Sequence, residues 1–228
     1  MVHLPFADRV EAGRLLAKEL YSRKIGLLRS AVVLAVTRGG VPVGFEVADR
    51  LHLPLDIVVA RKLSVPWQPE LAMGAIAGDS PILDDAMIRQ LGISPEDVED
   101  TVARERAEMK RREEIYRDGN PPLDLHARSA ILVDDGLATG NTMLASVRHA
   151  RGLDPAGMII GVPVGSKQAC ERLRPEVDDL VCLATPELFF AVGEWYRDFD
   201  QVSDAEVRRL LTESRQQLRK HPASAATA

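Results

Sequence analysis

Apolar residues occur along this chain in short continuous runs, and each run ends in polar or small residues. A run without polar alternation is typical of a strand that is covered on both faces of a parallel sheet. Such runs occupy residues 31–36, 55–60, 130–133, 157–164 and 179–184. Helical spacing is found between them, at residues 41–51, 143–153 and 166–173. The pattern therefore predicts an α/β fold with a central parallel sheet flanked by helices.

The stretch from Ser129 to Met143 is the most informative part of the chain. Its apolar run ends in two acidic residues, Asp134 and Asp135, and residues 136–142 then form a small-residue loop ahead of a predicted helix. In an open α/β sheet, the carboxyl end of a strand is where ligands bind. We therefore expect a ligand site directly after this strand.

Residues 136–142, called the phosphate loop below, have the composition of an anion-binding segment. Small side chains and glycines let successive backbone N–H groups face one anion, and the helix that follows adds its positive end. The hydroxyls of Thr139 and Thr142 and the amide of Asn141 add donors. The two carboxylates just upstream would repel a phosphate, so they are expected to bind vicinal hydroxyls, with or without Mg²⁺. A sugar phosphate satisfies both ends of the segment.

A second strand, residues 31–36, is also followed by residues that suit an anion. Thr37, Arg38, Gly39 and Gly40, called the glycine loop below, precede a helix that has a proline in its first turn. Paired glycines allow the backbone to approach an anion closely, and Arg38 offers a fork of donors. A Gly-Gly turn beside a solvated arginine is the alternative interpretation.

The run at residues 55–60 is expected to deliver two cations, Arg61 and Lys62, to the carboxyl end of a core strand. Residues 63–77 carry Pro66 and Trp67 between two β-prone pieces, which predicts a hairpin with a mobile tip. Right-handed crossovers place the carboxyl ends of parallel strands on one edge of the sheet, so these groups are expected to converge. For the two cations, a solvated strand end is the alternative.

Capping residues predict two helices. Asp8 and Glu11 begin one that runs to about residue 24, which we interpret as packing only. Ser94 begins another that runs to about residue 117, inside an insertion at residues 81–118. Its arginines and glutamates predict a solvated, salt-bridged face, and the alternative is that one or two arginines reach an anion.

Composition restricts the class of protein. The chain has 228 residues, 46% of them hydrophobic, which is enough for one α/β domain with a substantial core. The net charge of -5 argues against a nucleic-acid surface. Cys170 and Cys182 show no metal-binding spacing and are interpreted as buried thiols in a reducing cytoplasm. Because the N-terminal residues lack the apolar core of a secretory signal, a cytoplasmic protein without a membrane segment is predicted.

The stretch around Asp134 and Asp135 resembles the 5-phosphoribosyl-1-pyrophosphate (PRPP) binding motif of type I phosphoribosyltransferases. That motif is an apolar strand, two acidic residues, two or three small or apolar residues and then Thr-Gly-x-Thr, and residues 130–142 match it. The glycine loop resembles the pyrophosphate loop of the same family, and residues 63–77 take the place of its flexible loop. The resemblance is strong over residues 31–184. Overall it is greatest to a group of bacterial predicted phosphoribosyltransferases whose acceptor is unassigned.

The resemblance implies a Rossmann-like central parallel sheet flanked by helices, with a flexible hairpin and a C-terminal hood. It also implies an enzyme of nucleotide metabolism that transfers the 5-phosphoribosyl group from PRPP, with Mg²⁺, to a nitrogenous base or related acceptor and releases pyrophosphate. The catalytic residues implied are Asp134, Asp135, Arg38 and Lys62, and the two aspartates would hold the metal indirectly, through PRPP or water. The residues implied for PRPP binding are Thr37, Arg38, Gly39, Gly40, Arg61, Lys62, Asp134, Asp135, Gly136, Ala138, Thr139, Gly140, Asn141 and Thr142.

The acceptor cannot be read from these residues. Transferases of the hypoxanthine and guanine type carry a carboxylate where this chain has Ala138, which argues against that specificity. The loop looks more like that of adenine transferases, but the glycine loop and the long helix do not match that group well. Residues 185–201 are rich in aromatic side chains, and in the family this region contributes to a hood over the acceptor. Phe190, Trp195 and Tyr196 are thereby implied as acceptor-binding residues. Closure of a small core by the same rings is the alternative.

We expect one domain over residues 1–228, with a core at about 8–184, a hood at about 185–213 and a frayed tail at about 220–228. The expected partners are PRPP and a small-molecule acceptor, with a homodimer as one option for assembly. Two other functions stay open. One is a regulator that keeps the fold but binds RNA or nucleotides, against which the net charge of -5 counts. The other is transfer to a non-base acceptor in secondary metabolism.

Overall fold

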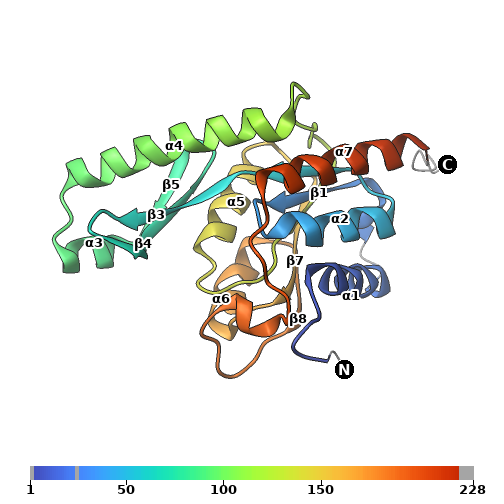
Figure 1. Ribbon diagram of the computed structural model, residues 1–228, viewed down its shortest axis with the longest axis horizontal. Coiled ribbons are helices and arrows are strands. Elements are labelled where there is room, and N and C mark those ends of the chain that lie inside the picture. Colours follow the sequence, from blue (N-terminus) through green and yellow to red (C-terminus); the bar gives the residue numbers. More distant parts are fainter. Residues whose placement is uncertain (1–2, 24–25, 221–228) are drawn as a thin grey trace.

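A parallel sheet of five strands forms the centre of the molecule in the computed structural model, which describes residues 3–23 and 26–220 (Figure 1). The strands are β1 (Ala31–Val36), β2 (Leu55–Val58), β6 (Ser129–Val133), β7 (Gly157–Val164) and β8 (Asp179–Ala184), in the spatial order β2-β1-β6-β7-β8. Every residue of β1, β6 and β7 is buried, as their continuous apolar runs predict. The expected α/β fold with a central parallel sheet is confirmed.

Helices cover both faces of this sheet. One face is covered by α1 (Arg9–Ser22), α2 (Gly40–Leu51) and α7 (Asp204–Lys220), and the other by α5 (Asn141–Arg151) and α6 (Lys167–Leu173). Alternation along β1 divides its side chains between the two layers, with Val33 in the first core and Val32 in the second. Short 3₁₀ turns lie at Gly26–Ser30, Arg174–Glu176 and Val192–Trp195.

The strand order reverses between β1 and β6. From β1 the chain crosses to β2 on one side, whereas β6, β7 and β8 follow on the other side. β1 and β6 are neighbours, with Val33 opposite Ile131 and Ala35 opposite Val133. The loops after these two strands therefore diverge at the carboxyl edge, which is where ligands bind in such sheets. The glycine loop and the phosphate loop flank this point.

A second sheet and two helices form an arm, residues 60–117, that projects from the body of the molecule (Figure 1). Its elements are the antiparallel strands β3 (Ala60–Val65), β4 (Gln68–Ala77) and β5 (Ser80–Leu83), followed by α3 (Asp85–Leu91) and α4 (Pro95–Arg117). At the start of α4 the Ser94 Oγ atom accepts a hydrogen bond from the Asp97 backbone N at 3.1 Å. The predicted hairpin and the predicted long helix are both confirmed.

The prediction of one strand over residues 55–60 is wrong. β2 ends at Val58, and from Ala60 the backbone pairs with β4, Ala60 lying opposite Ala77. Arg61 and Lys62 therefore lie on the arm and not at the carboxyl end of a core strand. A short apolar run cannot show that the chain leaves one sheet for another, because both strands are apolar at that point.

The C-terminal helix α7 is not predicted by the sequence patterns above. Residues 204–213, which were assigned to a hood, form most of α7, and this helix packs against α2 and α4. The expectation of a frayed tail falls mainly on residues 221–228, which lie outside the described residues. Within the part of the chain that the structure describes, we find no helix of the length and apolarity that a membrane span requires.

Candidate functional site

The two acidic residues Asp134 and Asp135 follow β6 at the point where the strand order reverses. Asp134 Oδ1 accepts a hydrogen bond from the Asp135 backbone N at 2.9 Å. Burial and the adjacent Asp135 charge raise the pKa of Asp134 well above its usual value, and Arg9 and Lys62 offset part of that rise. Burial likewise raises the pKa of Asp135, against the influence of Arg9. Adjacent half-buried carboxylates favour a ligand that brings hydroxyl donors or positive charge.

The phosphate loop runs from these carboxylates into the N-terminus of α5. Gly140 has a φ of 77°, a left-handed conformation that favours glycine, and Asn141 is the first residue of the helix. The loop is braced from below by the segment after β7. Leu137 donates its backbone N–H to the Val164 carbonyl at 3.0 Å, and the Ser166 hydroxyl donates to the Ala138 carbonyl at 2.7 Å. Val164, the last residue of β7, and Ser166 thus hold the phosphate loop in place.

The glycine loop packs directly on the acidic pair. A methyl group at Gly39 would overlap the Asp135 carboxylate, and one at Gly40 would lie 2.5 Å from the Val133 carbonyl oxygen. No larger residue fits at either position without displacing the backbone or the carboxylate. The Thr37–Arg38 peptide bond is cis. The paired glycines therefore bring the loop after β1 against the loop after β6.

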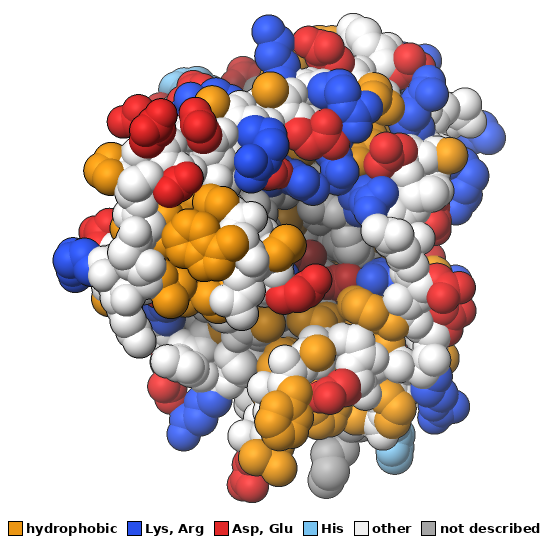
Figure 2. Space-filling view, turned by 60° about the vertical axis from the view of Figure 1, so that its left-hand side comes forward, with side chains coloured by type: hydrophobic (Ala, Val, Ile, Leu, Met, Phe, Trp, Pro, Cys, Tyr) orange, Lys and Arg blue, Asp and Glu red, His pale blue; other side chains and the backbone are white. Residues whose placement is uncertain are grey.

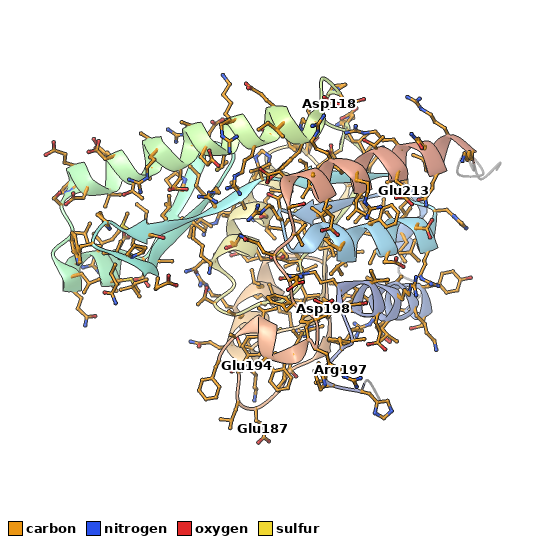
Figure 3. The ribbon with its side chains drawn as sticks, viewed as in Figure 1. Asp118, Glu187, Glu194, Arg197, Asp198 and Glu213 are labelled. Atoms are coloured by element: carbon orange, nitrogen blue, oxygen red, sulfur yellow. The ribbon has the colours of Figure 1, made fainter. Side chains whose placement is uncertain are left out.

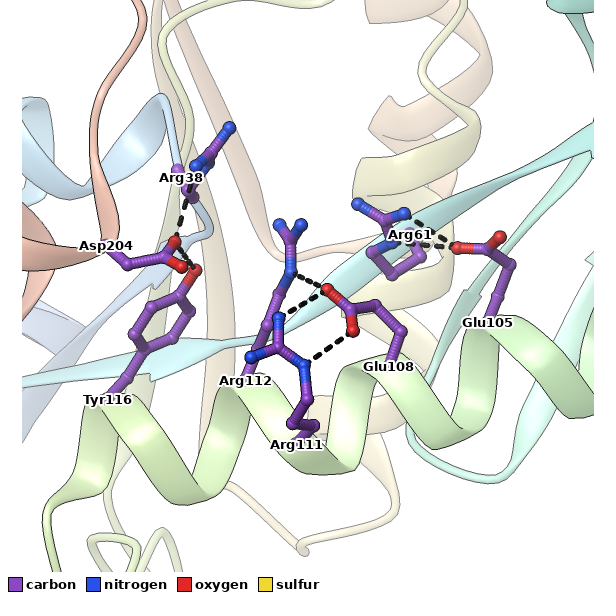
Figure 4. Close-up of polar contacts among 8 residues, drawn as sticks. All are labelled: Arg38, Arg61, Glu105, Glu108, Arg111, Arg112, Tyr116 and Asp204. Carbon is purple, nitrogen blue, oxygen red and sulfur yellow. Dashed lines mark hydrogen bonds and ion pairs between the residues drawn. The ribbon is translucent and has the colours of Figure 1, made fainter.

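Arg38 points from the glycine loop toward α7 and α4. Its Nη1 atom lies 3.3 Å from Asp204 Oδ1, and the Tyr116 hydroxyl donates to the same oxygen at 2.7 Å (Figure 4). These hydrogen bonds lower the pKa of Asp204, that of Tyr116 having the larger effect. Burial and the same contact raise the pKa of Tyr116 to about 12. The Arg38 guanidinium is thus held against Asp204 of α7, and Arg38 is not one of the residues that line the cavity described below.

The two cations of β3 point to opposite faces of the arm. Arg61 pairs with Glu105 of α4, its Nε lying 2.9 Å from Oε2 (Figure 4). Lys62 lies on the side of the acidic pair, where its charge lowers the pKa of Asp134. Alternation along the strand explains why neighbours in sequence serve different surfaces. The structure therefore brings Lys62 to the site and directs Arg61 to the long helix.

A cavity of about 800 Å³ lies between the arm and the phosphate loop. Figure 2 shows the molecule hollowed at this place, with acidic side chains at the margin of the hollow. The arm contributes Lys62 and several residues between Glu70 and Met87 to the lining. Helix α6 contributes Arg172, whose Nη1 atom donates a hydrogen bond to Asn141 Oδ1 at 2.6 Å. The predicted site residues that line the cavity are Lys62, Asp134, Asp135, Gly136, Ala138, Thr139, Gly140, Asn141 and Thr142.

The interpretation of the first helix as packing only is wrong. Arg9, the first residue of α1, lies with its Nε 2.9 Å from Asp135 Oδ2. The only sequence signal is an arginine at the start of a helix, where the helix dipole disfavours a cation. Such a signal does not identify the partner, because the two residues are 126 positions apart.

The rings implied for the acceptor are not part of the cavity lining, although Val192 of the same segment is. Tyr196 is 5% exposed, packs between Phe6 and Phe199, and donates its hydroxyl to the Asp135 carbonyl at 2.6 Å. Trp195 stacks on Phe189, and Phe190 is 78% exposed. Glu187 and Glu194 of this segment lie at the end of the molecule remote from α4 (Figure 3). This placement favours the small core for Tyr196, and the acceptor assignment stays a prediction.

Three comparisons relate the chain to known proteins. A family model described as "Phosphoribosyl transferase domain" matches residues 9–199. Proteins of two Mycobacterium tuberculosis strains, each named "Putative phosphoribosyl transferase", are 44% identical over 207 residues, which is 90% of this chain and 46% of theirs. The chain thus spans about half the length of these relatives.

Solved structures agree with this likeness. The crystal structure of TT1426 from Thermus thermophilus is 39% identical, with 92% of this chain and 99% of that chain covered and a TM-score of 0.76. A hypothetical protein from Neisseria gonorrhoeae with bound ppGpp has a TM-score of 0.50 at 13% identity, over 93% of this chain and 99% of that chain. The second likeness concerns the fold alone.

Proposed function

Because the chain belongs to the phosphoribosyl transferase domain family, we propose that it transfers the 5-phosphoribosyl group of PRPP to a small acceptor and releases pyrophosphate. The acceptor class that we favour is a nitrogenous base or a related nucleophile. The whole reaction, its donor and its metal are proposals, since family membership indicates a transferase and no more.

One observation carries the proposal: the two candidate anion loops meet at the acidic pair. The absence of side chains at Gly39 and Gly40 lets the glycine loop contact Asp135 and Val133, while the phosphate loop continues from the same two carboxylates. PRPP is an anion at both ends with vicinal hydroxyls between them. The backbone N–H groups of the two loops suit the two anionic ends of PRPP, and the carboxylates between the loops suit its hydroxyls.

Each part of PRPP is assigned to one part of this site. The 5-phosphate would bind the backbone N–H groups and hydroxyls of the phosphate loop at the positive end of α5. Asp134 and Asp135 would accept hydrogen bonds from the ribose hydroxyls. The pyrophosphate would then lie toward the glycine loop, with Lys62 reaching it from the arm and Arg38 from the loop itself.

The reaction forms a bond between the acceptor nucleophile and C1 of the ribose and breaks the bond from C1 to the pyrophosphate oxygen. The bonding electrons leave with pyrophosphate, so positive charge develops on the ribose and negative charge on the leaving group. The proton that an N–H or O–H acceptor loses as the bond to C1 forms passes to water or to the leaving pyrophosphate. The carboxylates of Asp134 and Asp135 stabilise the positive charge on the ribose. The negative charge on pyrophosphate is stabilised by Lys62, Arg38 and the N–H groups of the glycine loop. This charge separation favours electrostatic positioning as the main source of rate enhancement.

The donor set also suits Mg²⁺. Among the described residues there is no group of three or more His, Cys, Asp or Glu side chains that could hold a metal. Mg²⁺ usually takes one or two carboxylates and completes its shell with substrate oxygens and water. Asp134 and Asp135 would supply such a pair, directly or through water. A bound Mg²⁺ would neutralise negative charge on the pyrophosphate.

The test combines donor binding with an open search for the acceptor. The purified protein is incubated with PRPP, Mg²⁺ and a pooled library of bases, amines and sugars, and new phosphoribosyl products are identified by mass spectrometry. A product whose mass equals that of the acceptor plus the 5-phosphoribosyl group minus one hydrogen, with one pyrophosphate per product, supports the proposal. Calorimetry with PRPP and Mg²⁺ in the absence of acceptor runs in parallel, and failure to bind at millimolar concentration would refute it.

A further inference from the structure

Arg9 lies at a helical position where a cation is unfavourable. It is the first residue of α1, directly after the capping residue Asp8, and the helix dipole places positive charge at that end. Its side chain is nevertheless only 11% exposed. Burying a guanidinium at the positive end of a helix costs free energy, so the contacts that it makes must offset that cost.

Those contacts join three distant parts of the chain. The Arg9 Nε lies 2.9 Å from Asp135 Oδ2, and its Nη1 donates to the Asp200 carbonyl at 2.8 Å. The guanidinium carbon lies 3.9 Å from the centroid of the Phe199 ring, within the range of a cation–π contact. The arginine is therefore clamped between the acidic pair and the C-terminal segment.

Asp135 is held from two further directions. Tyr196 donates its hydroxyl to the Asp135 backbone carbonyl at 2.6 Å, and the Asp135 carboxylate rests against Gly39 of the glycine loop. In the described part of the chain, the carboxylate accepts one hydrogen bond from another side chain, that of Arg9 Nε to Oδ2, and Oδ1 has no side-chain partner. The side chain is thus fixed with one oxygen committed and the other available.

We infer that Arg9 is a positioning residue for the sugar phosphate donor, which acts by holding Asp135 with Oδ1 directed to a ribose hydroxyl. This inference rests on the proposed function, because it takes a ribose phosphate as the ligand of the acidic pair. The inference gives the two carboxylates different charge environments. Asp134 faces the cavity without an ion-pair partner in the described residues, whereas Asp135 is compensated by Arg9.

The same helix offers a matched control. Arg14 makes an ion pair of equal length, its Nε lying 2.9 Å from Glu46 Oε2, but its side chain is 54% exposed and does not reach the acidic pair. Arg14→Ala therefore removes one arginine and one ion pair of α1 without touching Asp135. Any effect of a lost charge or a weakened helix is common to both variants.

The experiment measures binding of ribose 5-phosphate and of inorganic pyrophosphate by calorimetry, with wild type, Arg9→Ala and Arg14→Ala. Arg9→Ala should weaken ribose 5-phosphate binding by roughly tenfold to a hundredfold, the range for a charged hydrogen bond. Arg14→Ala should stay within about twofold of wild type. Arg9→Lys keeps the charge and should recover part of the lost affinity.

A double-mutant cycle separates positioning from a general structural role. If Arg9 acts through Asp135, adding Arg9→Ala to Asp135→Asn should cost no more than about a further twofold, although each single change is costly. Additive losses, or equal losses for Arg9→Ala and Arg14→Ala, would overturn the inference.

Each Arg9 variant is first checked for folding, so that weaker binding can be attributed to the loss of the side chain. If Arg9→Ala does not fold by circular dichroism, Arg9→Gln, which keeps an N–H donor on a shorter, uncharged side chain, takes its place. If neither folds, Arg9 serves the fold and the inference is wrong. A wild type that binds ribose 5-phosphate while the Arg9 variants bind it equally well overturns the inference alone. A wild type that binds neither ribose 5-phosphate nor PRPP overturns the proposed function with it.

Discussion

Arg38 and Asp204 form an ion pair, Nη1 to Oδ1 3.3 Å, that joins the glycine loop to the first turn of α7. Tyr116, near the end of α4, donates its hydroxyl to the same carboxylate oxygen (Figure 4). The cation that the sequence assigns to pyrophosphate is therefore held by the arm and the C-terminal helix, neither of which belongs to the PRPP motif. An anion that binds at the glycine loop would compete with Asp204 for the guanidinium.

Arg38→Ala tests this cation. Removal of the guanidinium should weaken pyrophosphate binding by about 1.5 to 3 kcal/mol, the range for a charged hydrogen bond, because the leaving group loses a fork of donors. Ribose 5-phosphate binding should change little. Calorimetry with both ligands decides between the two outcomes: equal losses for both would assign Arg38 to the structure of the loop.

The pH dependence of stability reports on Asp204. The Tyr116 and Arg38 hydrogen bonds lower its pKa in the folded protein, so its contribution is present above the unfolded pKa of about 3.9 and is lost as the pH falls through the folded value. Because the side chain is 38% exposed, we expect about 0.5 to 1 kcal/mol. Asp204→Asn should unfold at lower urea than wild type at pH 6.

At acidic pH this difference should shrink, since the wild-type carboxyl is then protonated too. Glu206→Gln provides the control, as Glu206 lies in the same first turn of α7 but has no hydrogen bond to Arg38 or Tyr116. The lower pH for this comparison is 2.5, ~1.4 units below the unfolded pKa. If the difference in unfolding free energy between wild type and Asp204→Asn is the same at pH 6 and at pH 2.5, the ionised carboxylate contributes nothing to stability.

The acidic pair should control donor binding. PRPP with Mg²⁺ should raise the melting temperature of the wild type, because a ligand that binds only the folded state stabilises it by mass action. Asp134→Asn combined with Asp135→Asn should abolish the shift. Scanning calorimetry with and without PRPP measures it. A double variant that keeps the wild-type shift would move the donor site elsewhere.

The contact between Gly39 and Asp135 predicts a severe effect of a single methyl group. Gly39→Ala places Cβ on the Asp135 carboxylate, so either the glycine loop or the carboxylate must move. We expect a loss of stability of about 1 to 3 kcal/mol, the usual cost of overpacking, together with weaker PRPP binding. Gly26→Ala is the control, since its Cβ would meet no atom of the described residues within 4 Å, its two chain neighbours aside. Urea unfolding and calorimetry provide the two readings.

The aromatic residues of the C-terminal segment should separate into core and surface. Tyr196→Ala removes a buried ring and should cost about 3 to 5 kcal/mol of stability. Phe190→Ala, at an exposed position, should stay within about 0.5 kcal/mol. If Phe190 stacks on the acceptor, its variant would lose turnover while keeping stability. A stable Tyr196→Ala protein would contradict the small-core placement.

Elements that depend on local pattern could be predicted from the sequence. Strands β1, β7 and β8 begin and end where their apolar runs do. The long helix α4 begins after Ser94 and ends at Arg117, because capping side chains and helical periodicity act within a few residues. The order of the two loops around the acidic pair follows from the rule that parallel strands share a carboxyl edge.

Elements whose position depends on residues far away in the chain could not be predicted from the sequence. The departure of β3 from the parallel sheet after Val58 is decided by its pairing with β4, and the apolar run continues across it. The helix α7 is placed by packing on α2 and α4. Residues 164–166 hold the phosphate loop through two backbone hydrogen bonds to Leu137 and through the Ser166 hydroxyl, and neither partner in the loop is identified by its residue type.

The sequence by itself determined the class of fold, the acidic pair and the two candidate anion-binding loops, because each of these depends on the types and order of neighbouring residues. Only the tertiary structure decided which charges compensate one another. Arg9 pairs with Asp135, Arg38 with Asp204 and Arg61 with Glu105, at separations of 126, 166 and 44 residues. An ion pair depends on distance in space and on burial, and the order of residues along the chain specifies neither until the chain has folded.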